Sequence, residues 1–235
     1  MRKFFYANLA LAVALGAAPA RAEGGVKGKV VFEGKASKGE AVKMNADPKC
    51  LEQHKAGFLF EPIVVGPKGE LANAFIYVKQ GLEGRKFDAP RESKAILDQR
   101  GCWYHPRVSG IMVGQKLEIL NSDPTMHNVN AQPEFNAAMP AAVKKLEKAF
   151  KKPKVMFKIK CNVHPWMTTY VGVLEHPFYA VSGKDGSFEI KNLPPGKYTL
   201  EVWHEKLGSQ TREVTVPASG ATADFKFSAG AKGKS

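Results

Sequence analysis

Short runs of alternating or β-branched hydrophobic residues, separated by Gly, Pro and Asp, recur along most of the chain. Such runs are typical of strands, and many short strands with turn residues between them are typical of sandwiches and barrels. We therefore predict an all-β fold. The pattern predicts strands over residues 26–32, 61–66, 73–80, 116–120, 155–160, 168–174, 178–182, 187–191, 197–203, 211–216 and 223–227.

One lysine-rich stretch, residues 141–154, interrupts this pattern. It lacks a sustained apolar stripe, so the sequence predicts a short solvated helix or loop there, with a docking face as the alternative. The histidines at 176 and 204 fall at the edges of predicted strands, and we expect them to be hydrogen-bonded structural residues.

The first 22 residues have the pattern of a secretory signal peptide. Arg2 and Lys3 precede an apolar run over residues 9–18, and residues 20–22 read Ala-Arg-Ala, a cleavage signal. The run is too short to span a bilayer. We expect cleavage after Ala22, a periplasmic or secreted protein, and no membrane span.

The charge balance points to acidic partners. The formal net charge is +13, and removal of the leader with its three cations leaves +10. Such a charge steers a protein toward acidic surfaces and speeds encounter with them. Because nucleic acid is not the usual partner of an exported protein, we expect a protein partner and no nucleic acid.

The chain has three cysteines, an odd number for an exported protein. Cys50 and Cys102 are expected to form a disulfide, because export conditions oxidise paired thiols. The alternative is a Cys₂His₂ metal site, since His54 follows Cys50 and His105 follows Cys102 at permissive spacings. A covalently attached c-type haem is excluded because no C-x-x-C-H motif occurs.

The third cysteine lies in the segment CNVHPWM, which places Cys161, His164 and Met167 three residues apart. Two histidines and a cysteine with a weak axial methionine form the blue-copper ligand set. The segment NSDPTMHNVNA, after the strand predicted at 116–120, supplies the second histidine, His127. Zinc is disfavoured because methionine is a poor zinc ligand. A Cys–His nucleophile is disfavoured because the loop has no carboxylate to orient His164.

These two segments resemble the cupredoxins over about residues 95–175. CNVHPWM is similar to the copper loop of the amicyanin type, and MHNV is similar to the family's upstream segment. The resemblance implies a Greek-key β-sandwich that binds one type 1 copper ion. It also implies that Asn128 pins the copper loop by hydrogen bonding. The implied copper ligands are His127, Cys161, His164 and Met167.

The resemblance also implies a route for electrons. In cupredoxins the loop histidine is exposed at its edge within an apolar patch where redox partners dock. His164 would fill that position, with Pro165 and Trp166 beside it. Met126 and Met139 are further candidates for the patch.

The segment GSFEIKNLPPGKYTLEVWHEKLG resembles the carboxypeptidase-regulatory, transthyretin-like β-sandwich over about residues 178–228. The opening strands of that family lie far upstream here, as VKGKVVFEG and LANAFIYVKQG. The intervening stretch is too long for a loop, so we expect an inserted cupredoxin domain. Two sequential domains, 23–175 and 176–228, are the alternative. The expected bounds are 1–22 for the signal peptide, 23–83 and 176–228 for the transthyretin-like sandwich, 84–175 for the cupredoxin domain, and 229–235 for a flexible tail.

Together these features predict an exported one-electron carrier rather than an enzyme, working by outer-sphere transfer from copper. The positive charge favours an acidic redox partner, such as a cytochrome c or a membrane-bound oxidoreductase. Three alternatives stay open: a module that stores or delivers copper, a subunit that passes electrons to an enzyme, and a structural or glycan-binding protein in which copper is accessory.

Overall fold

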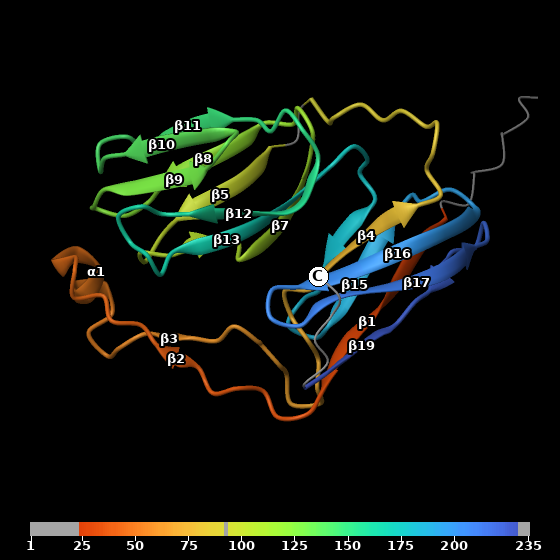
Figure 1. Ribbon diagram of the computed structural model, residues 1–235, viewed down its shortest axis with the longest axis horizontal. Helices are drawn as coiled ribbons and strands as arrows, with labels where there is room; N and C mark the ends of the chain where they lie inside the picture. The colour runs from red at the N-terminus through yellow and green to blue at the C-terminus, as the bar shows by residue number, and fades with distance from the viewer. Residues whose placement is uncertain (1–23, 92–93, 230–235) are drawn as a thin grey trace, which may run out of the picture.

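The computed structural model describes residues 24–91 and 94–229, and these form two β-sandwiches that lie side by side (Figure 1). Within this described part of the chain, all regular elements are strands apart from one short helix. The predicted signal peptide lies outside the described residues, as do residues 230–235 of the predicted tail. Within the described residues, no helix combines the length and the apolar character needed to cross a membrane.

The first sandwich packs two sheets against each other. One sheet has the order β15 (Ser187–Lys191), β1 (Gly25–Glu33), β18 (Ala221–Thr222), with β19 (Phe225–Ser228) paired to the far half of β1. The other has the order β14 (Tyr179–Val181), β4 (Phe75–Gln80), β16 (Gly196–His204), β17 (Gly208–Val216). Both sheets contribute buried apolar side chains to one core, among them Val30, Ile76, Phe188, Leu200 and Phe227.

The second sandwich also has two sheets. The first has the order β10 (Phe135–Met139), β9 (His127–Ala131), β12 (Lys154–Lys160), β13 (Thr168–Leu174), β7 (Val108–Met112). The second has the order β11 (Lys145–Lys148), β8 (Leu117–Asn121), β5 (Ala95–Gln99), β6 (Tyr104–His105). Strands β5 to β13 lie between β4 and β14 in the chain, while β4 pairs with β14 and β16. Two sequential domains would leave β4 without those partners.

Two of the elements that the sequence predicted differ in the structure. Residues 61–66 do not form a strand and make only one isolated bridge, between Val65 and Leu71. Pro62 cannot donate a ladder hydrogen bond, and Gly66 closes a turn by bonding to Glu70. The lysine-rich stretch is neither helix nor loop throughout, because its centre forms β11 at the edge of a sheet. Lysines are common on edge strands, where they discourage pairing with other chains.

An arm, residues 37–61, leaves the first sandwich after β1 and returns before β4. It carries the short pair β2 (Glu40–Ala41) and β3 (Leu59–Phe60), and the helix α1 (Pro48–Gln53) at its tip. Asp47 caps the helix by accepting a hydrogen bond from Lys49 N, and proline stands at the first helical position. Figure 1 shows that α1 lies at the end of the second sandwich, away from the first. The sequence pattern did not predict this helix.

Two glycines allow the sandwiches to pack closely. Gly110 of β7 and Gly172 of β13 are register partners, and an added Cβ would lie 2.2 Å from the Tyr179 ring and 2.3 Å from the Phe75 ring, respectively. These two aromatic rings, from the first sandwich, stack with centroids 5.6 Å apart. The two glycines, which have no side chain, therefore make room in the second sandwich for these aromatic side chains of the first.

Candidate metal centre

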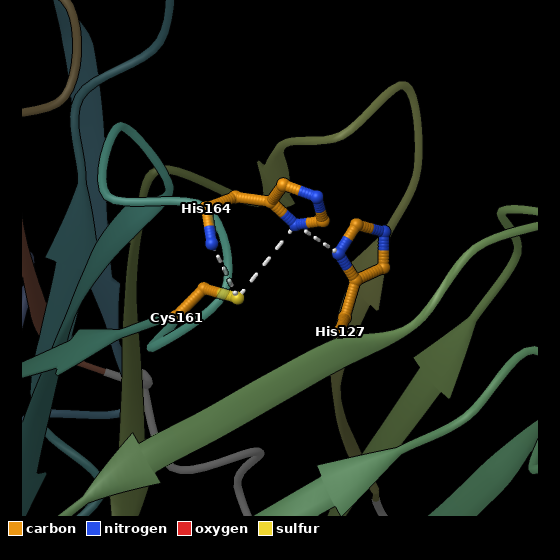
Figure 2. A group of neighbouring side chains, drawn as sticks. All are labelled: His127, Cys161 and His164. Carbon is orange, nitrogen blue, oxygen red and sulfur yellow. Dashed lines mark hydrogen bonds between the residues drawn. The ribbon is translucent and has the colours of Figure 1, made fainter. Parts of the chain in front are cut away.

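The structure brings together three of the predicted ligand residues, His127, Cys161 and His164 (Figure 2). His127 is the first residue of β9, and the other two lie on the loop between β12 and β13. The Nδ1 atoms of the two histidines are 2.9 Å apart, and Cys161 Sγ is 3.8 Å from His164 Nδ1. The three ligand atoms lie within 4.8 Å of one another.

Backbone hydrogen bonds within the loop between β12 and β13 hold Cys161 and His164 in place. Cys161 N donates to Met167 O at 3.2 Å, and Met167 N donates to His164 O at 2.9 Å. The amide of His164 also donates to Cys161 Sγ, at 3.4 Å. The fourth predicted ligand, Met167, is fully buried in the same core cluster as Cys161. The turn thus places all three loop residues predicted as ligands on the inner side of the sandwich.

Asn128 lies where a residue that pins the loop is expected. Its Oδ1 accepts a hydrogen bond from Asn162 N at 3.3 Å, which ties β9 to the loop. Its Nδ2 donates to Asn136 Oδ1 and to Ala137 O, so the amide side chain is fixed at both ends. A side chain held in this way orients the loop that it contacts.

Each histidine has a carboxylate behind it. His127 Nε2 lies 2.8 Å from Asp123 Oδ2, and His164 Nε2 lies 2.9 Å from Asp47 Oδ2. A carboxylate accepts from an N–H, so both rings carry hydrogen on Nε2 in their neutral form. The unprotonated Nδ1 atoms then face each other with their lone pairs, beside the sulfur of Cys161. Two lone pairs and a thiolate this close together repel one another, and a cation bound between them would remove that repulsion.

Both carboxylates are held by further hydrogen bonds. Asp123 accepts from Gly101 N and Cys102 N, each at 2.8 Å. Asp47 accepts from Lys49 N at 2.8 Å and from Thr125 Oγ1 at 2.6 Å. Burial opposes ionisation of these groups, but their hydrogen bonds outweigh it and lower the pKa of both carboxyls. Both residues therefore carry negative charge at neutral pH.

The same contacts favour the thiolate at Cys161. Burial alone would raise the pKa of this thiol, but hydrogen bonds from His127, His164 and the loop backbone lower it to about 6. Burial would likewise lower the pKa of His127, but Asp123 and Cys161 outweigh it and raise the pKa to about 9. In the metal-free protein the thiolate and a protonated imidazole therefore stabilise each other. A metal ion bound here would take the place of that proton.

The site is closed to solvent, which corrects the expected exposure of His164. His164 is 1% exposed, and His127, Cys161 and Met167 are 4% exposed or less. The arm covers the ring: Cys50 Sγ lies 3.6 Å from His164 Nε2, beside Asp47. The predicted electron-transfer patch therefore lacks the exposed edge of the His164 ring that was expected at its centre.

The chain neighbours of His164 in the predicted patch are more exposed to solvent than His164 itself. Pro165 is exposed and Trp166 is half-buried, with its ring centroid 5.1 Å from that of His164. Trp166 Nε1 donates to Cys102 O at 3.1 Å. Met126 is 44% exposed, but Met139 is fully buried and therefore no part of a surface patch.

Cys50 and Cys102 form a disulfide. The alternative Cys₂His₂ metal site is wrong, because the two sulfurs are bonded to each other. His54 and His105 instead pair with the backbone oxygens of Gly101 and Arg100. The disulfide joins α1 of the arm to the second sandwich, next to the candidate metal centre.

Sequence reasoning missed Asp123 and Asp47. Asp123 had a signal that could have been used, since it stands four residues before His127 in NSDPTMH. Asp47 had none, because 117 residues separate it from His164. Only the path of the arm brings it to the site.

The donor set fits the ion that the motif implies. Two imidazole nitrogens and a thiolate converge, and a buried thioether follows on the same loop. Such a mixed set of soft and borderline donors suits copper, which alternates between Cu(I) and Cu(II). His127, Cys161, His164 and Met167 would hold the ion.

Comparison with known proteins gives partial matches. The family model of the carboxypeptidase regulatory-like domain matches residues 171–228. A comparison with curated protein sequences gives no match. The similar solved structures include cupredoxins, each matched by less than half of this chain.

Three of these structures show how much of each chain is matched and how similar the matched parts are. A purple cupredoxin from Nitrosopumilus maritimus is 22% identical, with a TM-score of 0.30, over 34% of this chain and 98% of that chain. A mutant of amicyanin is 16% identical, with a TM-score of 0.31, over 42% of this chain and 97% of that one. A copper-containing nitrite reductase from Thermus scotoductus SA-01 is 22% identical, with a TM-score of 0.31, over 40% of this chain and 24% of its own. This chain thus spans about a quarter of that reductase. In sequence it is similar to the carboxypeptidase regulatory-like domain at its C-terminal end, and its structural neighbours are cupredoxins.

Proposed function

We propose that this protein is an exported one-electron carrier that binds a single type 1 copper ion. The observation that carries the proposal is the pair of Nδ1 atoms 2.9 Å apart beside Cys161, with both Nε2 atoms bound to carboxylates. That arrangement leaves three electron-pair donors directed at one point. Export is proposed from the leader pattern of residues 1–22, with cleavage after Ala22.

The protein's part in the reaction is to hold the donors still. The backbone bonds within the loop, Asn128 and the two carboxylates fix the ligand side chains before any ion binds. Copper bound there supplies the change between Cu(I) and Cu(II). A site that does not rearrange when its charge changes exchanges electrons with a low barrier, because little reorganisation accompanies transfer.

Electrons would leave through the residues that cover the site. The Trp166 ring packs against His164 and is partly exposed, and Pro165 beside it is exposed. We propose this part of the surface as the contact for an acidic redox partner, such as a cytochrome c or a membrane-bound oxidoreductase. The charge of +10 on the mature chain would steer the encounter.

Burial of the site favours a carrier over copper delivery. Transfer of an ion to another protein needs ligands that a partner can reach, but none of the four is more than 4% exposed. Electron transfer needs no such access. For the same reason we propose a carrier rather than an enzyme, since a substrate would have to reach the metal.

The first test is the visible absorption of the mature protein with Cu(II). We expect an intense thiolate-to-copper charge-transfer band, which disappears in Cys161→Ser and changes strongly in His164→Gln. His176→Gln, a histidine variant in the first sandwich, should keep the band. A colourless wild-type protein that binds zinc as tightly as copper would refute the proposed function.

A further inference from the structure

The arm reaches the candidate metal centre from outside the sandwich that carries the ligands. It begins and ends in the first sandwich, yet its tip provides Asp47 to His164 Nε2 at 2.9 Å. The same carboxylate oxygen accepts from Thr125 Oγ1 at 2.6 Å, two residues before His127. Asp47 thus bonds directly to His164 and to a residue, Thr125, that lies close to His127 in the chain.

The disulfide fixes the arm in this position. Cys50 lies on α1, three residues after Asp47, and its partner Cys102 donates its amide to Asp123, the carboxylate behind His127. Met44 and Cys50 of the arm pack with Cys102 and Trp166 in one small buried cluster. The carboxylate behind His164 is therefore held by a covalent bond, a helix cap and a packed cluster.

We propose that the arm is part of the metal site and that Asp47 is a positioning residue for His164, which makes the bound copper harder to reduce. This inference rests on the proposed function, because it concerns the ion bound there. It goes further by assigning a role to a segment outside the ligand-bearing sandwich.

The direction of the effect follows from charge. A carboxylate bound to the far nitrogen of an imidazole fixes the ring and increases its basicity as a ligand. Its negative charge, in a site closed to water, stabilises Cu(II) more than Cu(I) because the former carries one more positive charge. Loss of the charge should therefore raise the reduction potential.

The test compares Asp47→Asn with Glu52→Gln in the full chain. Each variant removes one negative charge at the tip of the arm, from the helix cap Asp47 or from Glu52 within α1, but the Glu52 side chain is 63% exposed. Asparagine is as good a helix cap as aspartate, so the arm should fold in both. We expect a clear positive shift of the potential in Asp47→Asn, with a rise in the ratio of Cu(I) to Cu(II) affinity. An equal shift in the two variants would overturn the inference.

A second variant tests the arm as a whole. In Cys50→Ala/Cys102→Ala, the arm is no longer tied to the second sandwich, and copper should pass to a chelator more than about tenfold faster than in wild type. Wild-type rate and potential in this variant would also overturn the inference. The proposed function fails separately, through the absence of the charge-transfer band in the wild-type protein.

Discussion

The side chain of Asn128 forms one hydrogen bond with the loop that carries Cys161 and two with strand β10, and the residue is 7% exposed. Its replacement leaves the amide of Asn162 and the oxygen of Ala137 without this partner. A hydrogen bond contributes about 0.5–1.5 kcal/mol to stability, and water replaces part of the loss because Asn162 is exposed and Ala137 is half-buried.

We accordingly expect Asn128→Ala to lower the free energy of unfolding of the metal-free protein by about 1–3 kcal/mol. Copper affinity should fall by about 10- to 100-fold, because the ligand loop is less constrained. Urea unfolding and competition with a copper chelator measure the two effects. Asn130→Ala is the control, since Asn130 also bonds to Asn162 but through side chains at the surface. Equal losses in both variants would contradict the role of Asn128.

His204 in the first sandwich has no contact with the candidate metal centre and is 1% exposed. Burial lowers the pKa of His204 to about 4, although the nearby carboxylate of Glu205 opposes the shift; Arg107 adds to it. Between these two pKa values the folded state keeps this histidine neutral, whereas the unfolded chain, with a pKa of about 6.5, is protonated. Its contribution to stability is present above pH ~6.5 and is lost as the pH falls toward 4.

Acidification from pH 7 to 4 should therefore cost the wild-type protein roughly 3 kcal/mol more than His204→Gln. Urea unfolding of the metal-free proteins at both pH values checks this difference. His105→Gln, at an exposed histidine, should lose as much stability as wild type. A His204→Gln variant that is equally acid-sensitive would disprove the expectation.

At the scale of elements, alternation and β-branched content predicted most strands of both sandwiches. The strands at 26–32, 73–80, 116–120, 155–160 and 168–174 are confirmed as β1, β4, β8, β12 and β13. The strands missed by the pattern include β9, HNVNA, and β10, FNAAM. Asn and Ala have low strand propensity, and these residues are held in strands by pairing with each other and by burial of one face.

The glycines of β7 and β13 offer a test at this scale. Gly172→Ala should destabilise the protein by about 1–3 kcal/mol, because the new Cβ would lie 2.3 Å from the Phe75 ring. Gly39→Ala is the control, since its Cβ would meet nothing nearer than 3.3 Å. Phe75→Leu in the Gly172→Ala background should recover part of the loss. No recovery in the double variant would mean that the two sites are independent, as a double-mutant cycle of unfolding free energies would show.

At the scale of the whole molecule, an ion pair joins the two sandwiches. Arg107, just before β7, donates from Nε and Nη2 to Glu205 at 2.7 and 2.6 Å. The Glu205 side chain is 5% exposed, and Arg107 also bonds to Thr168 O near the ligand loop. Removal of one partner of a buried ion pair strongly destabilises the folded state, because the remaining buried charge then has no partner.

Arg107→Met should therefore lower the free energy of unfolding by about 3–5 kcal/mol. Addition of Glu205→Gln should restore a large part of it, because the unpaired carboxylate is removed. Chemical unfolding followed by tryptophan fluorescence measures both. Arg212→Met, in the same sandwich as Glu205 but exposed, should cost far less. A small loss in Arg107→Met would show that the sandwiches do not depend on this pair.

The sequence by itself determined the local chemistry. Residues at fixed short spacing share a turn, so CNVHPWM predicted the convergence of Cys161 and His164, and HNV supplied His127. Period-two alternation predicted strands because each strand has one buried face. The Cys50–Cys102 disulfide followed from redox chemistry and an odd cysteine count.

Only the tertiary structure decided which groups surround the site. The burial of His164, its contact with Asp47 and the packing of the arm against Trp166 join segments more than 100 residues apart. No local pattern contains such contacts, because they arise when one sandwich extends an arm over the end of the other. The sequence therefore predicted which donor side chains converge, whereas the path of the arm determined their solvent access and their charged neighbours.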